Sequence, residues 1–375
     1  MDDRMPDTRK KVAKFLSSEG FSSLIAAFLT IVLGLFISFI LLFIFERNVS
    51  LDAFRVMITG SFGTIGVQKG MARVLFYATP LMLAGLSFGF TLKAGVFNIG
   101  VAGQFVVGLL TGVIVAIRCE GVFGDYLWLA AVLCGACAGA AWGAFQGFLQ
   151  AYFNMHPIVC GIMMNYIGLF LITAICEADP MVYAKGRGWT EVVPLKAIMP
   201  DLGLDRIFGQ TSAVNIGLYI AAALCVAAHF VLKRTTFGYE IKAVGHNAYA
   251  SQYAGINIKR TVILTMMLAG LFAGFGGAIQ HLSAADTHYA ITDALPQQGF
   301  TGVSIALIAM GHPIAIIFAA LFIAYLQVGG LGMQAYGLQP DFVNVITSLI
   351  IYFCAFNFVF KHWYGRLFKW LRRAK

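Results

Sequence analysis

The stretch FTLKAGVFNIGVAGQF, residues 90–105, lies between two long apolar runs and decides the fold. It combines a lysine and two amide residues, Lys93, Asn98 and Gln104, with three glycines. A turn would explain the glycines and a packed core would explain the phenylalanines, but neither explains amides at membrane depth. We therefore interpret Lys93 as an anchor at the inner face of a membrane, after which the chain bends and enters the membrane again.

The composition of the whole chain is that of a membrane protein. Of 375 residues, 59% are hydrophobic and 11% are charged, whereas soluble domains carry about 25% charged residues. The net charge of +9 comes from residues at the ends of apolar runs, so we expect no nucleic-acid partner. Cys134 and Cys137 form a CxxC in a small-residue helix sequence, and we interpret them as packing residues and expect no metal site.

Ten apolar runs predict an all-α, polytopic membrane fold. The first has 25 residues without a charge, which is too long for the apolar part of a signal peptide, so we expect a retained span. Around GHP at 311–313, residues 300–328 form either one broken helix or two short ones. The runs are Phe21–Phe45, Val74–Leu92, Val96–Ile117, Leu127–Leu149, Ile158–Cys176, Val214–Leu232, Thr261–His281, Phe300–Ala309, Ile314–Val328 and Phe342–Phe360.

The distribution of basic residues predicts the orientation, because cytoplasmic flanks are enriched in Lys and Arg. The segments assigned to the inside hold 17 of the 26, and both termini are then cytoplasmic. The segment 46–73 argues against this, since it places four basic residues outside. The predicted organisation is a cytoplasmic tail (1–20), a transmembrane domain (21–360) with an external loop (177–212) and a cytoplasmic loop (233–260), and a basic cytoplasmic tail (361–375).

A sequence repeat suggests how the spans are related. LMLAGLSFGF at 81–90 matches MMLAGLFAGF at 266–275 at seven of ten positions. In the predicted topology the first runs inward and the second outward. This is the pattern of an inverted repeat, in which substrate pathways form between the two halves, although apolar sequence also gives such matches by chance.

The absence of several motifs narrows the function. No span interior contains Asp, Glu, Lys or Arg, which disfavours a proton-coupled carrier. No GK dipeptide is present, so the chain has no phosphate-binding loop for ATP, and it has no HExxH motif. We expect no catalytic residue, while a carrier or channel that acts alone stays open.

The polar residues at membrane depth are uncharged amides. Each of them either joins helices by hydrogen bonds or contacts the solute. As a set they favour a pathway for a neutral, hydrogen-bonding solute. The candidate pathway residues are Asn98, Gln104, Asn165, Gln280, Gln327 and Asn344, with Asn357 beside them. His229 and His312, near span ends, are interpreted as interfacial histidines.

The cytoplasmic loop 233–260 is the most informative polar segment. Its spacing predicts a helix from Tyr239 to Ala254 with a face of small residues, suited to docking on another protein. The alternative is a helix on the membrane surface, but such helices need bulky apolar residues.

Four segments resemble permease subunits of bacterial ATP-binding cassette (ABC) importers. The resemblance is to the branch for simple sugars, branched-chain amino acids and, most of all, nucleosides, and within it to the longer nucleoside permease. FNIG followed by GQ, and the AGI-containing cytoplasmic loop, are its most specific features. The segments are ATPLMLAGLSFGFTLKAGVFNIGVAGQ (78–104), IMMNYIGLFL (162–171), FGYEIKAVGHNAYASQYAGINIKR (237–260) and GFTGVSIALIAMGHP (299–313).

The resemblance implies about ten spans and a coupling loop at 233–260, in which Glu240, Gly245, Ala254 and Gly255 take the recognisable places. It also implies partners: a second, shorter permease, a cytoplasmic ABC ATPase that uses the ATP, and an extracytoplasmic binding protein or lipoprotein. The location would be the bacterial cytoplasmic (inner) membrane and its lipid, with no cofactor in this chain.

The sequence departs from the family at two places. Ala102 and Gly103 stand where an acidic residue often precedes GQ, and Pro157 begins a segment that often carries Glu. We expect a permease for nucleosides, the alternatives being a simple-sugar ABC permease or a stand-alone carrier.

Overall fold

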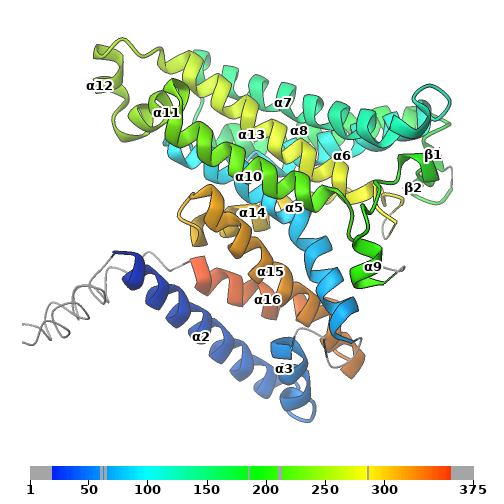
Figure 1. Cartoon of the computed structure of the whole chain (residues 1–375). Helices are drawn as coiled ribbons and strands as arrows, with labels where there is room; N and C mark the ends of the chain where they lie inside the picture. Colours follow the sequence, from blue (N-terminus) through cyan, green and yellow to red (C-terminus); the bar gives the residue numbers. More distant parts are fainter. Residues whose placement is uncertain are drawn as a thin grey trace, which may run out of the picture. The chain divides into compact units, whose positions relative to one another are not determined.

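The computed structural model describes residues 19–59, 62, 66–184, 186–209, 213–284 and 287–355, and these are mostly helical (Figure 1). They form two compact units, one of residues 1–60 with 329–375 and one of residues 61–328. Residues 1–18 of the predicted N-terminal tail, the whole predicted C-terminal tail, the last residues of the tenth predicted span and Asn357 lie outside the described residues.

Seven described helices are long and apolar enough to cross a membrane, so the chain is a multi-pass membrane protein. The predicted count of ten is not confirmed, because α14 (Gln297–Ile308) has only 12 residues and two further apolar helices are short in their described parts. The seven are α5 (Val67–Lys93), α6 (Val101–Arg118), α7 (Leu127–Phe153) with η1 (Gly124–Tyr126), α8 (Pro157–Ala178), α10 (Gly217–Arg234), α13 (Ile258–His281) and α15 (Pro313–Met333) with η3 (Gln334–Tyr336).

The structure answers the question left open for residues 300–328, since α14 and α15 are separate helices. Met310 and Gly311 between them have φ angles of 51° and 65°. This left-handed backbone ends α14 and turns the chain into α15.

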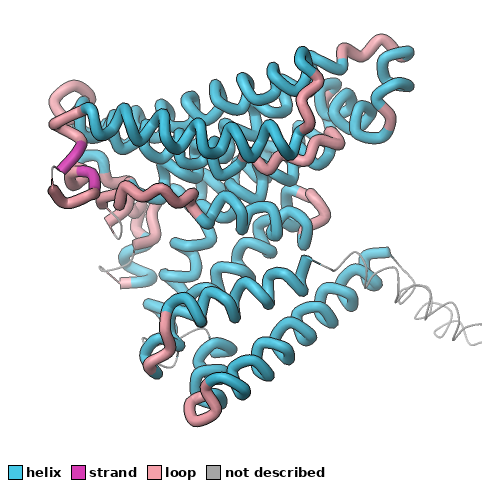
Figure 2. The backbone as a smooth tube through the Cα atoms, turned by 180° about the vertical axis from the view of Figure 1, so that it is seen from behind, coloured by secondary structure: helices cyan, strands magenta, loops and turns pink. Residues whose placement is uncertain are grey.

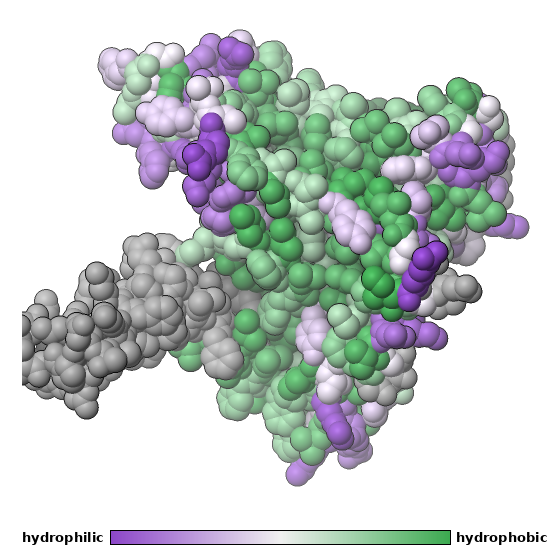
Figure 3. Space-filling model, viewed as in Figure 1, coloured by the Kyte–Doolittle hydropathy of each residue, from purple (hydrophilic) through white to green (hydrophobic). Residues whose placement is uncertain are grey.

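The core of the unit 61–328 is built on close contact between α7, α13 and α6, which run side by side (Figures 1 and 2). A Cβ atom on Gly270 of α13 would lie 2.1 Å from the backbone oxygen of Gly139 on α7. Only glycine allows this approach, so the glycines of α7 form a packing surface. Cys134 and Cys137, which we interpreted as packing residues, are exposed. Hydrophilic side chains gather at the two ends of this unit and hydrophobic ones between them (Figure 3).

The other unit contains α2 (Glu19–Phe45), α3 (Ser50–Thr59) and α16 (Pro340–Ala355). Gly34 of α2 lies against the backbone of Ile350 on α16, and the Ser38 hydroxyl donates to the Ile346 carbonyl at 3.3 Å. The predicted first and last spans therefore pack on each other.

The long connection after α8 contains the only strands among the described residues, which are otherwise mostly helical. These strands, β1 (Tyr183–Ala184) and β2 (Trp189–Thr190), pair antiparallel and are followed by η2 (Leu195–Ala197) and α9 (Leu204–Phe208). The hairpin and the connection 235–257 lie at opposite ends of α7 and α13 (Figures 1 and 2).

The single helix predicted from Tyr239 to Ala254 is wrong. The structure has two shorter helices, α11 (Thr236–His246) and α12 (Ala248–Tyr253). Asn247 separates them with an extended backbone (φ −158°, ψ 105°), and its side chain accepts a hydrogen bond from the Ala250 N–H. Asparagine favours this capping role over the interior of a helix, so the chain stops and restarts there.

Candidate solute pathway and coupling surface

The stretch 90–105 forms a turn at the end of α5. Gly95 has a φ of 72°, and the Val96 N–H bonds back to the Thr91 carbonyl at 3.1 Å. The Phe97 ring then meets the Phe88 ring edge-on, with centroids 4.9 Å apart. Because Phe88 lies more than one turn before the end of α5, the chain runs back alongside that helix before α6 begins.

Three buried amides form a closed ring of hydrogen bonds behind this turn. Asn98 Nδ2 donates to Gln104 Oε1 at 3.3 Å, Gln104 Nε2 to Gln146 Oε1 at 3.0 Å, and Gln146 Nε2 to Asn98 Oδ1 at 3.2 Å. All three side chains are fully buried. The oxygen of Asn98 also accepts from the Gly100 N–H at 3.0 Å. We name Asn98, Gln104, Gln146 and the adjoining Asn165 the amide network.

Asn165 joins α8 to the same turn. Its Oδ1 accepts from the Gly103 N–H at 2.7 Å, and its Nδ2 donates to the Ile99 carbonyl at 3.0 Å. The network therefore supplies partners for backbone groups at the start of α6, which have none inside the helix. It brings together three predicted pathway residues and one, Gln146, that sequence reasoning missed.

Ala102 and Gly103, the first of the two places at which the sequence departs from the family, lie in tight helix contacts. A Cβ on Gly299 of α14 would lie 2.4 Å from Ala102 Cα, and a Cβ on Gly103 would lie 2.7 Å from Asn165 Cα. Ala102 is fully buried. An acidic side chain has no space at either position in this packing.

Gln280, at the end of α13, lines a cavity of about 400 Å³ near the β hairpin. Its Oε1 is buried and has no hydrogen-bond partner among the described residues. None of the described residues in the lining is Asp, Glu, Lys or Arg, and they come from α6, α13, the hairpin, the segment before α14 and the start of α14. They are Leu109, Trp189, Gln280, His281, His288, Tyr289, Ala290, Thr292, Pro296 and Gln298.

Aromatic rings form one wall of this cavity, which we name the outer cavity after the predicted orientation of the chain. The Trp189 and His288 rings meet edge-on with centroids 4.9 Å apart. Burial raises the pKa of the Tyr289 phenol above its usual value, so that ring stays neutral. Backbone hydrogen bonds hold the wall, from Thr190 N–H to the Tyr289 carbonyl at 2.9 Å and from Ile291 N–H to the Gly188 carbonyl at 2.9 Å.

The other predicted pathway residues lie elsewhere. Gln327 is half-buried on α15, and Asn344 is exposed on α16 in the other unit. Neither lines the outer cavity. Trp189, His288 and Gln298 were missed, because their positions depend on contacts between segments about a hundred residues apart.

The predicted coupling residues lie on α11 and around α12. Glu240 accepts a hydrogen bond from the Thr261 hydroxyl of α13 at 3.4 Å. A Cβ on Gly245 would lie 2.2 Å from the Lys93 backbone oxygen, so α11 touches the turn after α5 backbone to backbone. Ala254 and Gly255 are exposed at the end of α12, where Gly255 has a φ of 84°.

Three exposed tyrosines lie on the same connection and were not predicted as site residues. Tyr239, Tyr249 and Tyr253 are 67%, 80% and 95% exposed. Tyrosine is enriched in protein interfaces, because its ring offers contact area and its hydroxyl a hydrogen bond. Their recurrence in a polar loop is the signal that could have identified them.

Comparison with known proteins gives the family. The branched-chain amino acid transport system / permease component family matches residues 70–355. The guanosine ABC transporter permease NupP of Bacillus subtilis is 30% identical over 93% of this chain and 97% of its own. The nucleoside ABC transporter permease NupB of Lactococcus lactis is 34% identical over 79% of this chain and 81% of its own.

Further relatives extend this pattern. The glucose ABC transporter permease TsgB13 of Haloferax volcanii is 30% identical over 83% of this chain and 82% of its own. B. subtilis and L. lactis each hold a second matching permease, NupQ and NupC. No solved structure matches. With a family match over most of its length, the chain belongs to the branched-chain amino acid transport system permease family of ABC transporters.

Proposed function

We propose that this chain is the membrane-spanning permease subunit of an ABC importer that moves nucleosides, or a closely related small polar solute, across the bacterial cytoplasmic membrane. The observation that carries the proposal is the outer cavity. It presents the Gln280 oxygen, which has no partner among the described residues, beside aromatic rings, and the part of its lining that the structure describes contains no Asp, Glu, Lys or Arg. A nucleoside is neutral and has a planar base with N–H donors, so it matches such a lining.

The pathway leads from this cavity toward the start of α6. Gln280 and Gln298 contact the solute, whereas Asn98, Gln104 and Asn165 hold the helix ends that form its inner boundary. Gln327 contributes from α15. An extracytoplasmic binding protein or lipoprotein delivers the solute, and a second permease completes the pathway. The pairs of relatives in B. subtilis and L. lactis support a second, different permease.

ATP is used by a separate cytoplasmic ATPase that docks on α11 and α12. Gly245 connects this surface to the turn that holds α6, so a displacement of α11 reaches the pathway through backbone contact. A bound solute is released inward when the ATPase biases the chain toward its inward-open state.

The same proposal includes ten spans, cytoplasmic termini and an inverted repeat. The repeated sequence lies in α5 and α13, and each is followed by a further helix, α6 or α14. The first turns of α6 and α14 meet at Ala102 and Gly299. In transporters with inverted repeats, substrate sites form where helix ends from the two repeats meet. The contact between α6 and α14 therefore supports a substrate site at this place.

Solute uptake tests this function. Cells that express the chain with the transporter genes beside it should accumulate labelled guanosine or adenosine, and unlabelled nucleosides should compete. Glucose should not compete, although the likeness to a glucose permease makes sugar transport the second candidate. If glucose competed and nucleosides did not, the solute would be a sugar and the nucleoside assignment would be wrong.

A Gly245→Val variant separates the ABC importer from a carrier that acts alone. The added side chain forces α11 away from Lys93, so uptake should fall more than tenfold while the chain still reaches the membrane. A Gly121→Val variant is the matched control, at an exposed turn outside the coupling loop, where a Cβ would meet nothing within 4 Å. Full uptake by Gly245→Val would favour the stand-alone carrier.

A further inference from the structure

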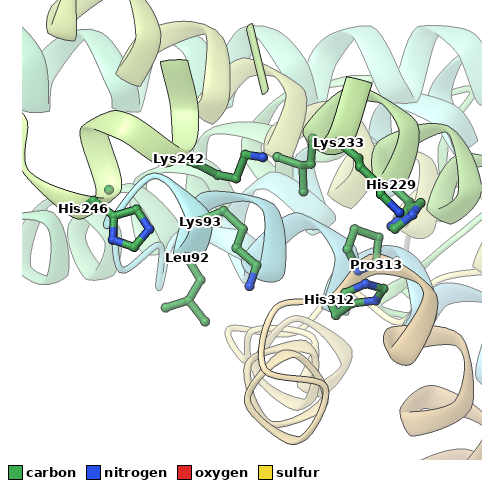
Figure 4. Close-up of a pocket in the computed structure, with 10 residues that line it drawn as sticks. Leu92, Lys93, His229, Lys233, Lys242, His246, His312 and Pro313 are labelled. Carbon is green, nitrogen blue, oxygen red and sulfur yellow. The ribbon is translucent and has the colours of Figure 1, made fainter. Parts of the chain in front are cut away.

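A second cavity, of about 490 Å³, lies beside α11 and is surrounded by basic side chains (Figure 4). They come from the end of α5, the end of α10, α11 and the turn before α15. None of the described residues that line it is acidic. The basic residues are Lys93, His229, Lys233, Lys242, His246 and His312.

The geometry keeps these groups together without a protein carboxylate between them. Lys93 lies between Lys242 and His312 (Figure 4), and its Nζ donates to the Met310 carbonyl at 2.9 Å. An ammonium group has three donors, so two remain for a ligand. The rings of His229 and His312 have centroids 5.1 Å apart.

The acidic residue of α11 does not neutralise this cluster, because Glu240 accepts its hydrogen bond from Thr261 and is absent from the lining. Burial lowers the pKa of His312 below its usual value, and the positive charges of His229, Lys93 and Lys233 lower it further. Like charges gathered in a partly buried site repel one another unless an anion lies among them.

We propose that this cavity binds a phosphate-bearing anion, either the headgroup of an acidic phospholipid or a soluble phosphate compound. Ammonium groups are suitable donors for phosphate oxygens, and a neutral imidazole ring adds one N–H donor. The volume exceeds that of one water molecule, about 30 Å³, many times over, so a substituted phosphate fits. Leu92, Leu232 and Pro313 add apolar wall beside the charges. In the proposed orientation the cavity lies at the inner ends of α5 and α10, at the level of lipid headgroups.

Binding there would restrain α11. Lys242 and His246 belong to α11, whereas Lys93 and Lys233 lie at the ends of α5 and α10. One phosphate group bound among them would therefore join α11 to two membrane helices. A ligand at this place therefore stabilises one position of α11 relative to the helix ends.

The test compares two double variants of the full-length chain. Lys233→Gln with Lys242→Gln removes two exposed charges that line the cavity, and Arg234→Gln with Arg260→Gln removes two exposed charges that do not. Inorganic pyrophosphate is titrated calorimetrically against the chain in phosphatidylcholine nanodiscs. Separately, native mass spectrometry measures how much phosphatidylglycerol and phosphatidylcholine the detergent-purified chain retains.

We expect one probe to bind and its affinity to fall roughly ten- to thirtyfold in the cavity variant, at about 1 kcal/mol per basic group. The control variant should change less than threefold. Pyrophosphate binding identifies a soluble ligand, and selective retention of phosphatidylglycerol identifies a lipid. Hydrogen exchange of residues 236–246 should slow when the ligand is bound. Equal losses in both variants, or binding of neither probe, would overturn the proposal.

Discussion

The chain contains two groups of amides that differ in how their hydrogen bonds are satisfied. In the amide network, Asn98, Gln104 and Gln146 bond to one another in a ring and are fully buried. In the outer cavity, the Gln280 oxygen is buried without a partner among the described residues. The residue type is the same, but the first group has used its hydrogen-bonding capacity and the second has not.

This difference separates two roles that sequence cannot distinguish. A satisfied amide contributes to stability, and its loss leaves the partners unpaired. An unsatisfied acceptor that lines a cavity costs stability and is available to a solute. Mutations in the two groups should therefore act on different quantities.

The largest expected effect is on the amide network. Gln146→Leu should lower the free energy of unfolding by about 2 kcal/mol, because it leaves groups of Asn98 and Gln104 buried without partners. Thermal unfolding of the purified chain measures this. Gln252→Leu, an exposed amide on α12, should stay within about 0.5 kcal/mol of the parent. Equal stability of the two variants would mean that the ring does not hold the turn.

An intermediate effect is expected at Gln280. Gln280→Leu should lower the ratio of maximal uptake rate to KM about tenfold through loss of one hydrogen bond to the solute. Its unfolding temperature should stay the same or rise, since a buried unpaired acceptor is removed. If stability fell with unchanged uptake, Gln280 would belong with the amide network instead.

The smallest expected effect is at the aromatic wall. Trp189→Leu should raise the KM of uptake roughly three- to tenfold, because an aromatic pair with a base is worth about 0.5–1.5 kcal/mol beyond its buried area. The maximal rate should change little. Tyr126→Leu, at an exposed aromatic residue outside the cavity lining, serves as the control. A similar change in both would assign the effect to general loss of surface aromatics.

Much of the membrane fold was predictable from the sequence, because a long apolar run by itself indicates a helix that can cross the membrane. Seven of the predicted runs correspond to long apolar helices. The run at Phe300–Ala309 corresponds to the short helix α14, which ends at Ile308. The extra break between α11 and α12 was also readable, since Asn247 has the residue type of a helix cap, but the continuous alanine spacing favoured one helix.

The sites were less predictable, because they depend on pairing between distant segments. Gln104 and Gln146 are 42 residues apart, and a single glutamine in an apolar helix gives no indication of its neighbours. The wall of the outer cavity requires residues 188–193 to pair with residues 287–291. Periodicity reports which residues are buried in an element, but it does not report which element they meet.

The approach of Gly245 to Lys93 has a mechanical consequence. Most helix contacts involve side chains, which can change rotamer and absorb a small displacement. Here the Gly245 Cα and the Lys93 carbonyl approach so closely that even a methyl group has no room. No flexible side chain lies between the two backbones, so a shift of α11 toward α5 by a few tenths of an ångström pushes directly on the turn at Gly95. The turn then has to move together with α11.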